Sequence, residues 1–182
     1  MSNTWYIAVE KFGPSSGEKW LDYLKWSQLP QLKELVSLDT MLCPSIIEEF
    51  TDEDWQHNIQ ADYLISFFTN IEYLRARLAG RTSINILAVM REPSLQDVQT
   101  FTDGRFVFQG YDLIERPGQG ISAISNCGGF DRAFKPTDIS EVGLFEDYDF
   151  ARIVQQRLRE HYPDEPHADC YLWAIWKLQD LE

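Results

Sequence analysis

The sequence predicts an α+β fold: a single domain over residues 1–182, with a largely antiparallel sheet, a central hairpin at about 105–127 and two or three amphipathic helices packed on it. A chain of 182 residues has the usual size of one domain and can bury a substantial core. Short β-prone segments alternate with segments of helical periodicity, and turn residues separate them. No repeat, low-complexity tract or linker divides the chain, which favours one domain.

The clearest turn signal lies at residues 116–120, where Arg-Pro-Gly-Gln-Gly separates two β-prone runs. The first run, 105–115, carries apolar residues on both faces, a pattern typical of a strand inside a sheet rather than at its edge. We therefore expect a hairpin in the middle of the sheet. Within it, Tyr111 and Asp112 are interpreted as a half-buried tyrosine beside a solvated acid.

The N-terminal third is expected to contain two strands around a helix. Residues 5–10 are β-prone and predict the first strand. Ser15 and Glu18 have the spacing of a capping box, which predicts a helix over about 16–28. Alternation over 36–42 predicts the second strand.

The most regular apolar pattern lies between residues 51 and 79 and predicts helix. Thr51 is placed to cap the first turn, and Gly80 is the expected stop. Because no helix breaker interrupts the pattern, the sequence allows one long helix or two pieces bent near Gln60. Apolar residues recur at i, i+3 and i+4 spacing: Leu64, Phe67, Phe68, Ile71, Leu74 and Leu78.

Three further elements complete the predicted fold. Residues 83–90 are almost continuously apolar and predict a buried strand. Asp147 is placed to cap an amphipathic helix that ends before Pro163. Over 167–178 two sets of residues alternate strictly, which favours a closing strand over a helix that starts at Pro166.

The charge of the chain restricts its partners. The net charge is −13, with ten acids against four bases in residues 1–60 and twelve against six in residues 121–182. Such a balance disfavours binding to nucleic acid and to anionic membranes, since both attract lysine and arginine. We expect a cytoplasmic protein: the N-terminus lacks the features of a signal peptide, no apolar run is long enough to span a membrane, and the odd number of cysteines suggests no disulfide framework.

Two acidic segments are the candidate partner-binding residues. Part of the first has a structural explanation, because acids in the first turn of a helix complement its dipole. Acids and tyrosines are also the residue types with which a protein inhibitor meets a basic active site. We therefore expect an acidic protein-binding module, most concretely an inhibitor or immunity-type protein that neutralises a basic toxin or nuclease. The residues are Glu48, Glu49, Asp52, Glu53 and Asp54, followed by Asp147, Tyr148 and Asp149.

The alternative is a small cysteine-dependent hydrolase or transferase. Cys127 ends the predicted second strand of the hairpin and precedes two glycines, whose N–H groups could hold an oxyanion. His57, His161 and His167 are the possible bases, and the spacing selects none of them. No catalytic motif, phosphate loop or set of metal ligands is present, so a protein without enzymatic activity, cofactor or metal is favoured.

Overall fold

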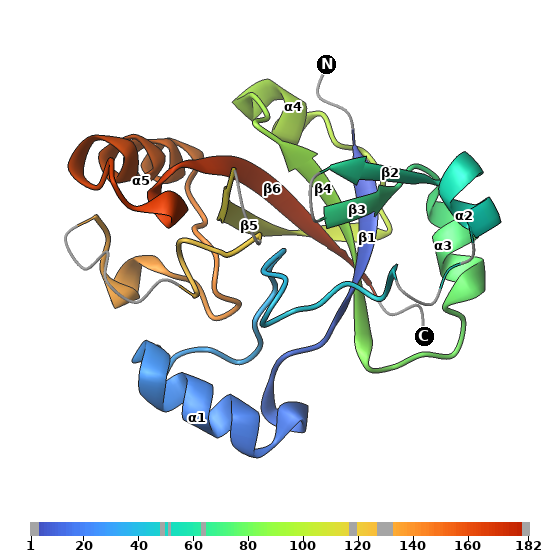
Figure 1. Cartoon of the computed structure of the whole chain (residues 1–182), viewed down its shortest axis with the longest axis horizontal. Helices are drawn as coiled ribbons and strands as arrows, with labels where there is room; N and C mark the ends of the chain where they lie inside the picture. Colours follow the sequence, from blue (N-terminus) through green and yellow to red (C-terminus); the bar gives the residue numbers. More distant parts are fainter. Residues whose placement is uncertain are drawn as a thin grey trace.

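The fold is built on one six-stranded antiparallel sheet with the spatial order β2-β3-β1-β4-β6-β5 (Figure 1). The computed structural model describes residues 4–47, 50, 52–62, 65–116, 120–126 and 133–179. The strands are β1 (Trp5–Glu10), β2 (Ile59–Asp62), β3 (Ile65–Phe68), β4 (Ile84–Arg91), β5 (Phe106–Glu115) and β6 (Cys170–Leu178). The α-helices are α1 (Glu18–Ser27), α2 (Asp52–His57), α3 (Ile71–Arg77), α4 (Leu95–Gln99) and α5 (Tyr148–His161). The predicted single α+β domain is therefore confirmed.

Helices lie at both ends of the sheet. In Figure 1, α5 lies beside β5 and β6, whereas α2 and α3 lie at the opposite end, beside β2 and β3. The larger cluster of buried residues includes Trp20 of α1 and Leu158 of α5, and the smaller one packs Leu74 of α3 and its C-cap Leu78 against Phe68. None of the described helices is long and apolar enough to cross a membrane.

Most elements with a local signal form where expected. The strands predicted at 5–10, 83–90 and 167–178 correspond to β1, β4 and β6. The helix predicted at 16–28 is α1, and Asp147 caps α5 as expected. The alternation in the last segment therefore indicated strand correctly.

The prediction of a helix over residues 51–79 is wrong. This segment forms α2, the strand pair β2–β3, and α3, whose N-cap Asn70 accepts hydrogen bonds from the backbone N–H groups of the first turn. Phe67 and Phe68 explain the difference, because neighbouring residues of a strand point to opposite faces and each face is covered here. Phe67 stacks on Trp173 at 5.2 Å, and Phe68 packs against Phe50 at 4.8 Å. Apolar residues on both faces of these strands therefore gave the same i, i+3 and i+4 spacing as the apolar stripe of an amphipathic helix.

The prediction of a strand over residues 36–42 is also wrong, because backbone N–H groups of this segment donate to polar side chains rather than to a neighbouring strand. The Asp39 carboxylate accepts from the N–H groups of Met41 and Leu42, at 2.9 and 2.8 Å, and so closes a turn. Ser37 and Asp39 are as buried as their apolar neighbours. The alternation therefore marks an irregular segment whose residues 36–39 are all buried, polar and apolar alike.

The predicted hairpin exists only in part, and it is not central. β5 is the last strand in the order and pairs with β6 along its length. The chain does return beside the end of β5, where the N–H of Ala123 donates to Leu113 O at 2.7 Å, but this return makes a bridge rather than a strand. Apolar residues occur on both faces of β5 because α5 covers one face and the segment around Ser37 covers the other.

Candidate functional site

The acidic segment at 48–54 is only partly described by the structure. Glu48 and Glu49 lie outside the described residues. Asp52 begins α2, and its side chain also lies outside the description. The Glu53 carboxylate is exposed to solvent.

Asp54 has a structural role. Its carboxylate pairs with the Arg77 guanidinium at 3.3 Å and accepts a hydrogen bond from the Tyr73 hydroxyl, so it joins α2 to α3. The same guanidinium lies 5.2 Å from the centre of the Phe50 ring. A carboxylate held in this way is poorly available to a partner.

The start of α5 presents three exposed acids: Glu146, Asp147 and Asp149. Asp147 is the N-cap and accepts from the N–H of Phe150 at 2.7 Å, which satisfies one of the free donors of the first turn. Among the described residues, Glu146 and Asp149 form no ion pair. Within the described part of the chain, no cation therefore competes with a partner for these two carboxylates.

Tyr148 is half-buried and holds the start of α5 on the sheet. Its hydroxyl donates to Pro93 O at 2.9 Å and accepts from Arg152 Nε at 3.1 Å. Its ring meets the Tyr111 ring edge-on, with centroids 5.6 Å apart. The residue predicted as a contact thus mainly positions the acids on either side of it.

A polar cluster around Glu92 fixes α5 further. The Glu92 carboxylate pairs with Arg152 and accepts from Gln155 Nε2 and from the N–H of Leu172, at 2.7 and 2.8 Å. Burial acts to raise the pKa of Glu92, but these hydrogen bonds outweigh burial and lower the pKa. Because the helix is anchored through ionised groups, its acidic N-terminal end has a defined position.

β5 carries two exposed apolar side chains, one on each face. Phe108 of β5 is 37% exposed although its ring contacts Trp176 and Tyr111, both at 5.2 Å between centroids. Val107, its neighbour, is 41% exposed on the other face of the strand. An aromatic ring that packs against other rings on one side and is exposed to solvent on the other is a typical anchor of protein interfaces.

The field of the acids reaches the aromatic residues of β5. Burial, and after it the charges of Tyr148, Asp147 and Asp149, together raise the pKa of Tyr111 to about 12. The ring contacts run from Phe108 through Tyr111 to Tyr148, which has Asp147 and Asp149 as its chain neighbours. We call this surface the acidic–aromatic surface: Phe108, Glu146, Asp147, Tyr148 and Asp149.

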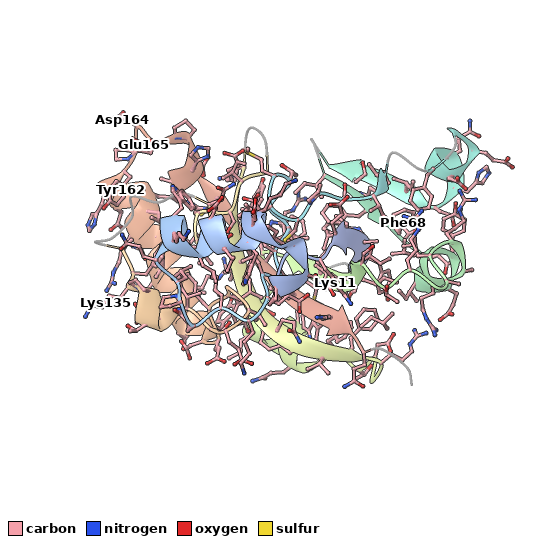
Figure 2. All side chains as sticks on the ribbon, turned by 90° about the horizontal axis from the view of Figure 1, so that it is seen from below. Lys11, Phe68, Lys135, Tyr162, Asp164 and Glu165 are labelled. Carbon is pink, nitrogen blue, oxygen red and sulfur yellow. The ribbon has the colours of Figure 1, made fainter. Side chains whose placement is uncertain are left out.

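The two predicted acidic segments do not form one surface. α2 lies at the β2 end of the sheet and α5 at the β5 end (Figure 1). Figure 2 shows the same separation: Phe68, which packs against Phe50 just before α2, and Tyr162, just after α5, lie at opposite ends of the molecule. A single partner site is therefore built on one segment or the other.

A buried polar network lies on the other face of β5, where the sequence suggested a solvated acid. Asp112 is fully buried, which corrects that expectation. It accepts from the hydroxyls of Ser37 and Ser122, at 2.5 and 2.6 Å, and from the N–H of Leu113 at 2.8 Å. Burial raises the pKa of Asp112 to about 6, although both serine hydrogen bonds lower it. The network ties distant loops to β5 and has a structural role.

The thiol chemistry considered for Cys127 falls on a residue outside the described part of the chain. The two described cysteines, Cys43 and Cys170, are buried, and burial raises the pKa of both thiols, to about 12 for Cys170. His167 pairs with the buried carboxylate of Glu115. Among the described residues, no group of three or more histidine, cysteine or acidic side chains is arranged to hold a metal ion.

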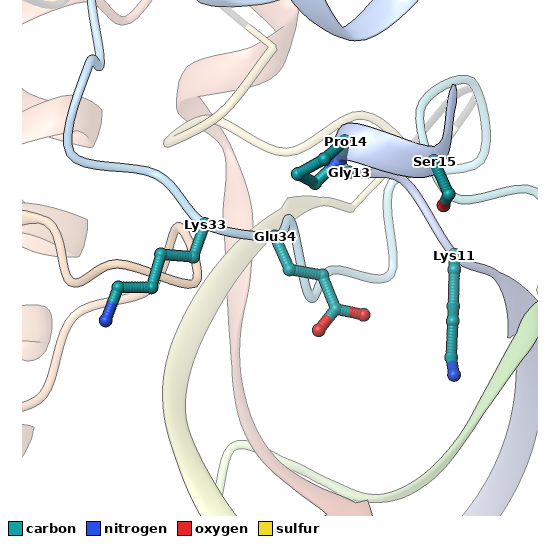
Figure 3. A pocket seen from close by; sticks show the side chains of 6 residues that line it. All are labelled: Lys11, Gly13, Pro14, Ser15, Lys33 and Glu34. Atoms are coloured by element: carbon teal, nitrogen blue, oxygen red, sulfur yellow. The ribbon is translucent and has the colours of Figure 1, made fainter. Parts of the chain in front are cut away.

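An open hollow of about 160 Å³ lies at another edge of the protein, between Lys11, Lys33 and Glu34 (Figure 3). Figure 3 shows the Glu34 carboxylate between the two lysines. Glu34 already accepts from Lys177 Nζ and Asn85 Nδ2, both at 2.6 Å, and Lys33 pairs with Glu141. The charges of the hollow are thus largely balanced within the chain, and it offers less to a ligand than the acidic–aromatic surface.

The acidic–aromatic surface contains the sequence-predicted Asp147, Tyr148 and Asp149, and the structure adds Phe108 and Glu146 to them. Glu146 continues the same acidic run, so the run itself contained the signal. Phe108 could not be assigned, because its exposure depends on β5 being an edge strand. No protein-family model, no curated protein and no solved structure matches this chain.

Proposed function

We propose that this chain is an acidic protein-binding module of the cytoplasm, most concretely an inhibitor or immunity-type protein that neutralises a basic partner such as a toxin or a nuclease. The observation that carries the proposal is the exposed ring of Phe108, which is connected through the rings of Tyr111 and Tyr148 to the helix start that carries the exposed acids Glu146 and Asp149. Free, buried thiols at Cys43 and Cys170 support a reducing compartment.

The physical basis is a division of tasks within the surface. An exposed aromatic ring supplies contact energy when a partner removes it from water. Carboxylates at the rim contribute little energy individually but raise the association rate with a basic partner and select it over others. On a nuclease, such carboxylates would occupy the place of substrate phosphates.

The α5 acids replace the α2 acids as the leading candidates. Asp54 is neutralised by Arg77 within the chain, whereas Glu146 and Asp149 have no such partner among the described residues. A defined backbone position also favours the α5 acids, because a preorganised surface loses less conformational entropy on binding.

The proposal is tested by the double variant Glu146→Gln/Asp149→Asn. The immobilised protein is exposed to extract of the cells that produce it, at about 50 mM and about 300 mM salt, since added salt shortens the range of exposed charges. We expect the unchanged protein to retain a basic protein at the lower salt concentration and the variant to retain several-fold less of it.

The matched control is Glu160→Gln/Asp164→Asn, which removes the same charge from the last turn of α5 and from the chain just after it. Both residues are exposed. The control should bind like the unchanged protein. If it loses the partner equally, the effect is one of net charge, and if neither double variant loses it, the acidic–aromatic surface is not the binding site.

A further inference from the structure

The outer edge of β5 is covered over only part of its length. Beyond Tyr111 the edge is occupied: the N–H of Tyr111 donates to Phe145 O at 2.8 Å, and the N–H of Glu115 donates to Ile121 O at 3.0 Å. Before Tyr111, none of the described residues forms a bridge to the strand on that side. The exposure of Val107 and Phe108 agrees with an open edge.

The hydrogen-bond pattern indicates which backbone groups face outward. Hydrogen-bonded and non-hydrogen-bonded pairs alternate along an antiparallel ladder. Arg105 O accepts from the N–H of Gln179 and therefore faces β6. By alternation, Phe106 and Phe108 face away from β6, and the N–H of Phe106 is already taken by Asp103 O. Phe108 thus offers an N–H and a C=O, and Phe106 a C=O, to an incoming strand.

The edge has a removable cover. A β-bulge interrupts the pairing between Phe108 and Gly110, and the side-chain amide of Gln109 donates to the outward-facing Phe108 O at 3.5 Å. Bulges and side-chain caps of this kind protect edges against random pairing. Because the Gln109 side chain is partly exposed, breaking its hydrogen bond costs little free energy: water then takes the place of the lost partner.

The acids of the surface begin where the edge becomes open. Glu146 and Asp147 follow Phe145, the last residue that pairs with β5 on this side. A second copy of this chain would bring the same acids to the same edge, so like charges oppose pairing of two β5 strands. A segment rich in lysine or arginine would instead have complementary charge.

We propose that a basic, extended segment of the partner adds as a strand to the open half of β5, residues 106–109, beside the acidic–aromatic surface. This inference rests on the proposed function and specifies its docking mode. The outward backbone groups of Phe108 supply hydrogen bonds, and side chains of the added strand that share the face of α5 meet Glu146 and Asp149.

The test uses a seven-residue peptide of alternating lysine and valine as the probe, with its glutamate–valine counterpart as the charge control. Affinity is measured by calorimetry, and amide hydrogen exchange is followed on the unchanged protein. We expect the basic probe to bind at least about tenfold more tightly than the acidic one and to slow exchange at residues 106–109. Slowed exchange elsewhere, or none, overturns the proposal.

Two variants of Phe108 distinguish the contribution of its backbone N–H to binding from that of its ring. Phe108→Ala removes the ring and keeps the N–H, whereas Phe108→Pro removes both, and circular dichroism shows whether each variant folds. One lost hydrogen bond predicts that the proline variant binds about fivefold more weakly than the alanine variant. Equal affinities of two folded variants refute strand addition.

The same variants distinguish the docking mode from the function. If a basic partner from extract depends on Glu146 and Asp149 but binds Phe108→Pro as well as Phe108→Ala, the function stands and strand addition fails. If no basic partner depends on these acids, the function itself fails.

Discussion

Replacing Asp112 by asparagine tests how the protein holds a carboxylate without a cation. The side chain is fully buried, and each of its oxygens accepts from a serine hydroxyl, Ser37 on one and Ser122 on the other. Asparagine has the same shape, cannot ionise, and places an NH₂ group where one oxygen accepted. The substitution therefore removes the titration and adds a donor that faces other donors.

The magnitude follows from the pKa of Asp112, which burial raises from 3.8 to about 6. A raised pKa means that the folded state binds the proton more tightly than the unfolded state. The stabilisation by the proton is fully present below pH 3.8 and is lost as the pH rises through about 6. Two units of pKa correspond to about 3 kcal/mol. The misplaced donor costs about 1–3 kcal/mol at every pH.

At about pH 4, the free energy of unfolding of Asp112→Asn should therefore be lower than that of the unchanged protein. At about pH 7, the difference between the two should be smaller by about 3 kcal/mol, because the unchanged protein has lost the stabilisation by the proton. Urea unfolding followed by tryptophan fluorescence measures this, and Trp173 lies opposite Asp112 on β6 as a reporter. The exposed Glu18→Gln variant controls for the loss of a charge. Parallel pH profiles for Asp112→Asn and the unchanged protein would refute the reasoning.

Three further predictions concern other parts of the fold. Gly110→Ala places a methyl group 2.5 Å from a carbonyl oxygen, at a φ of 138°, and should lower the free energy of unfolding by about 2–4 kcal/mol; Gly104→Ala, whose methyl meets nothing within 4 Å, is the control in the same melts. Asn70→Ala removes the cap of α3 and should cost about 1 kcal/mol in urea unfolding. Cys43 and Cys170 should react with iodoacetamide only after unfolding, as mass spectrometry would show, because burial raises both thiol pKa values.

The elements that could be predicted from the sequence are those with a purely local signal. Turn residues bound β1 and β4, an aspartate caps α5, and strict alternation marks β6. The segment at 51–79 failed because its apolar spacing fits both a helical stripe and a strand that is buried on both faces. Contacts with Trp5 and Trp173, both far from it along the chain, decide between the two for Phe67.

The candidate site was predictable only in its charged half. The acidic run at 146–149 is visible in the sequence, and its position before an amphipathic helix is a local property. The neighbourhood of Phe108 is not, because it depends on β6 rather than the chain after Gly120 pairing along β5. Asp112 was misjudged for a related reason: its serine partners lie in two distant loops.

The position of β6 has a consequence for the order in which the sheet can assemble. β6 is the last strand in sequence, yet it lies between β4 and β5 and pairs with both. During synthesis, β5 cannot join the other strands until residues 170–178 have left the ribosome. Until then β4 and β5 each expose an edge that the folded chain covers, so the nascent chain is exposed to mispairing between the synthesis of β5 and that of β6.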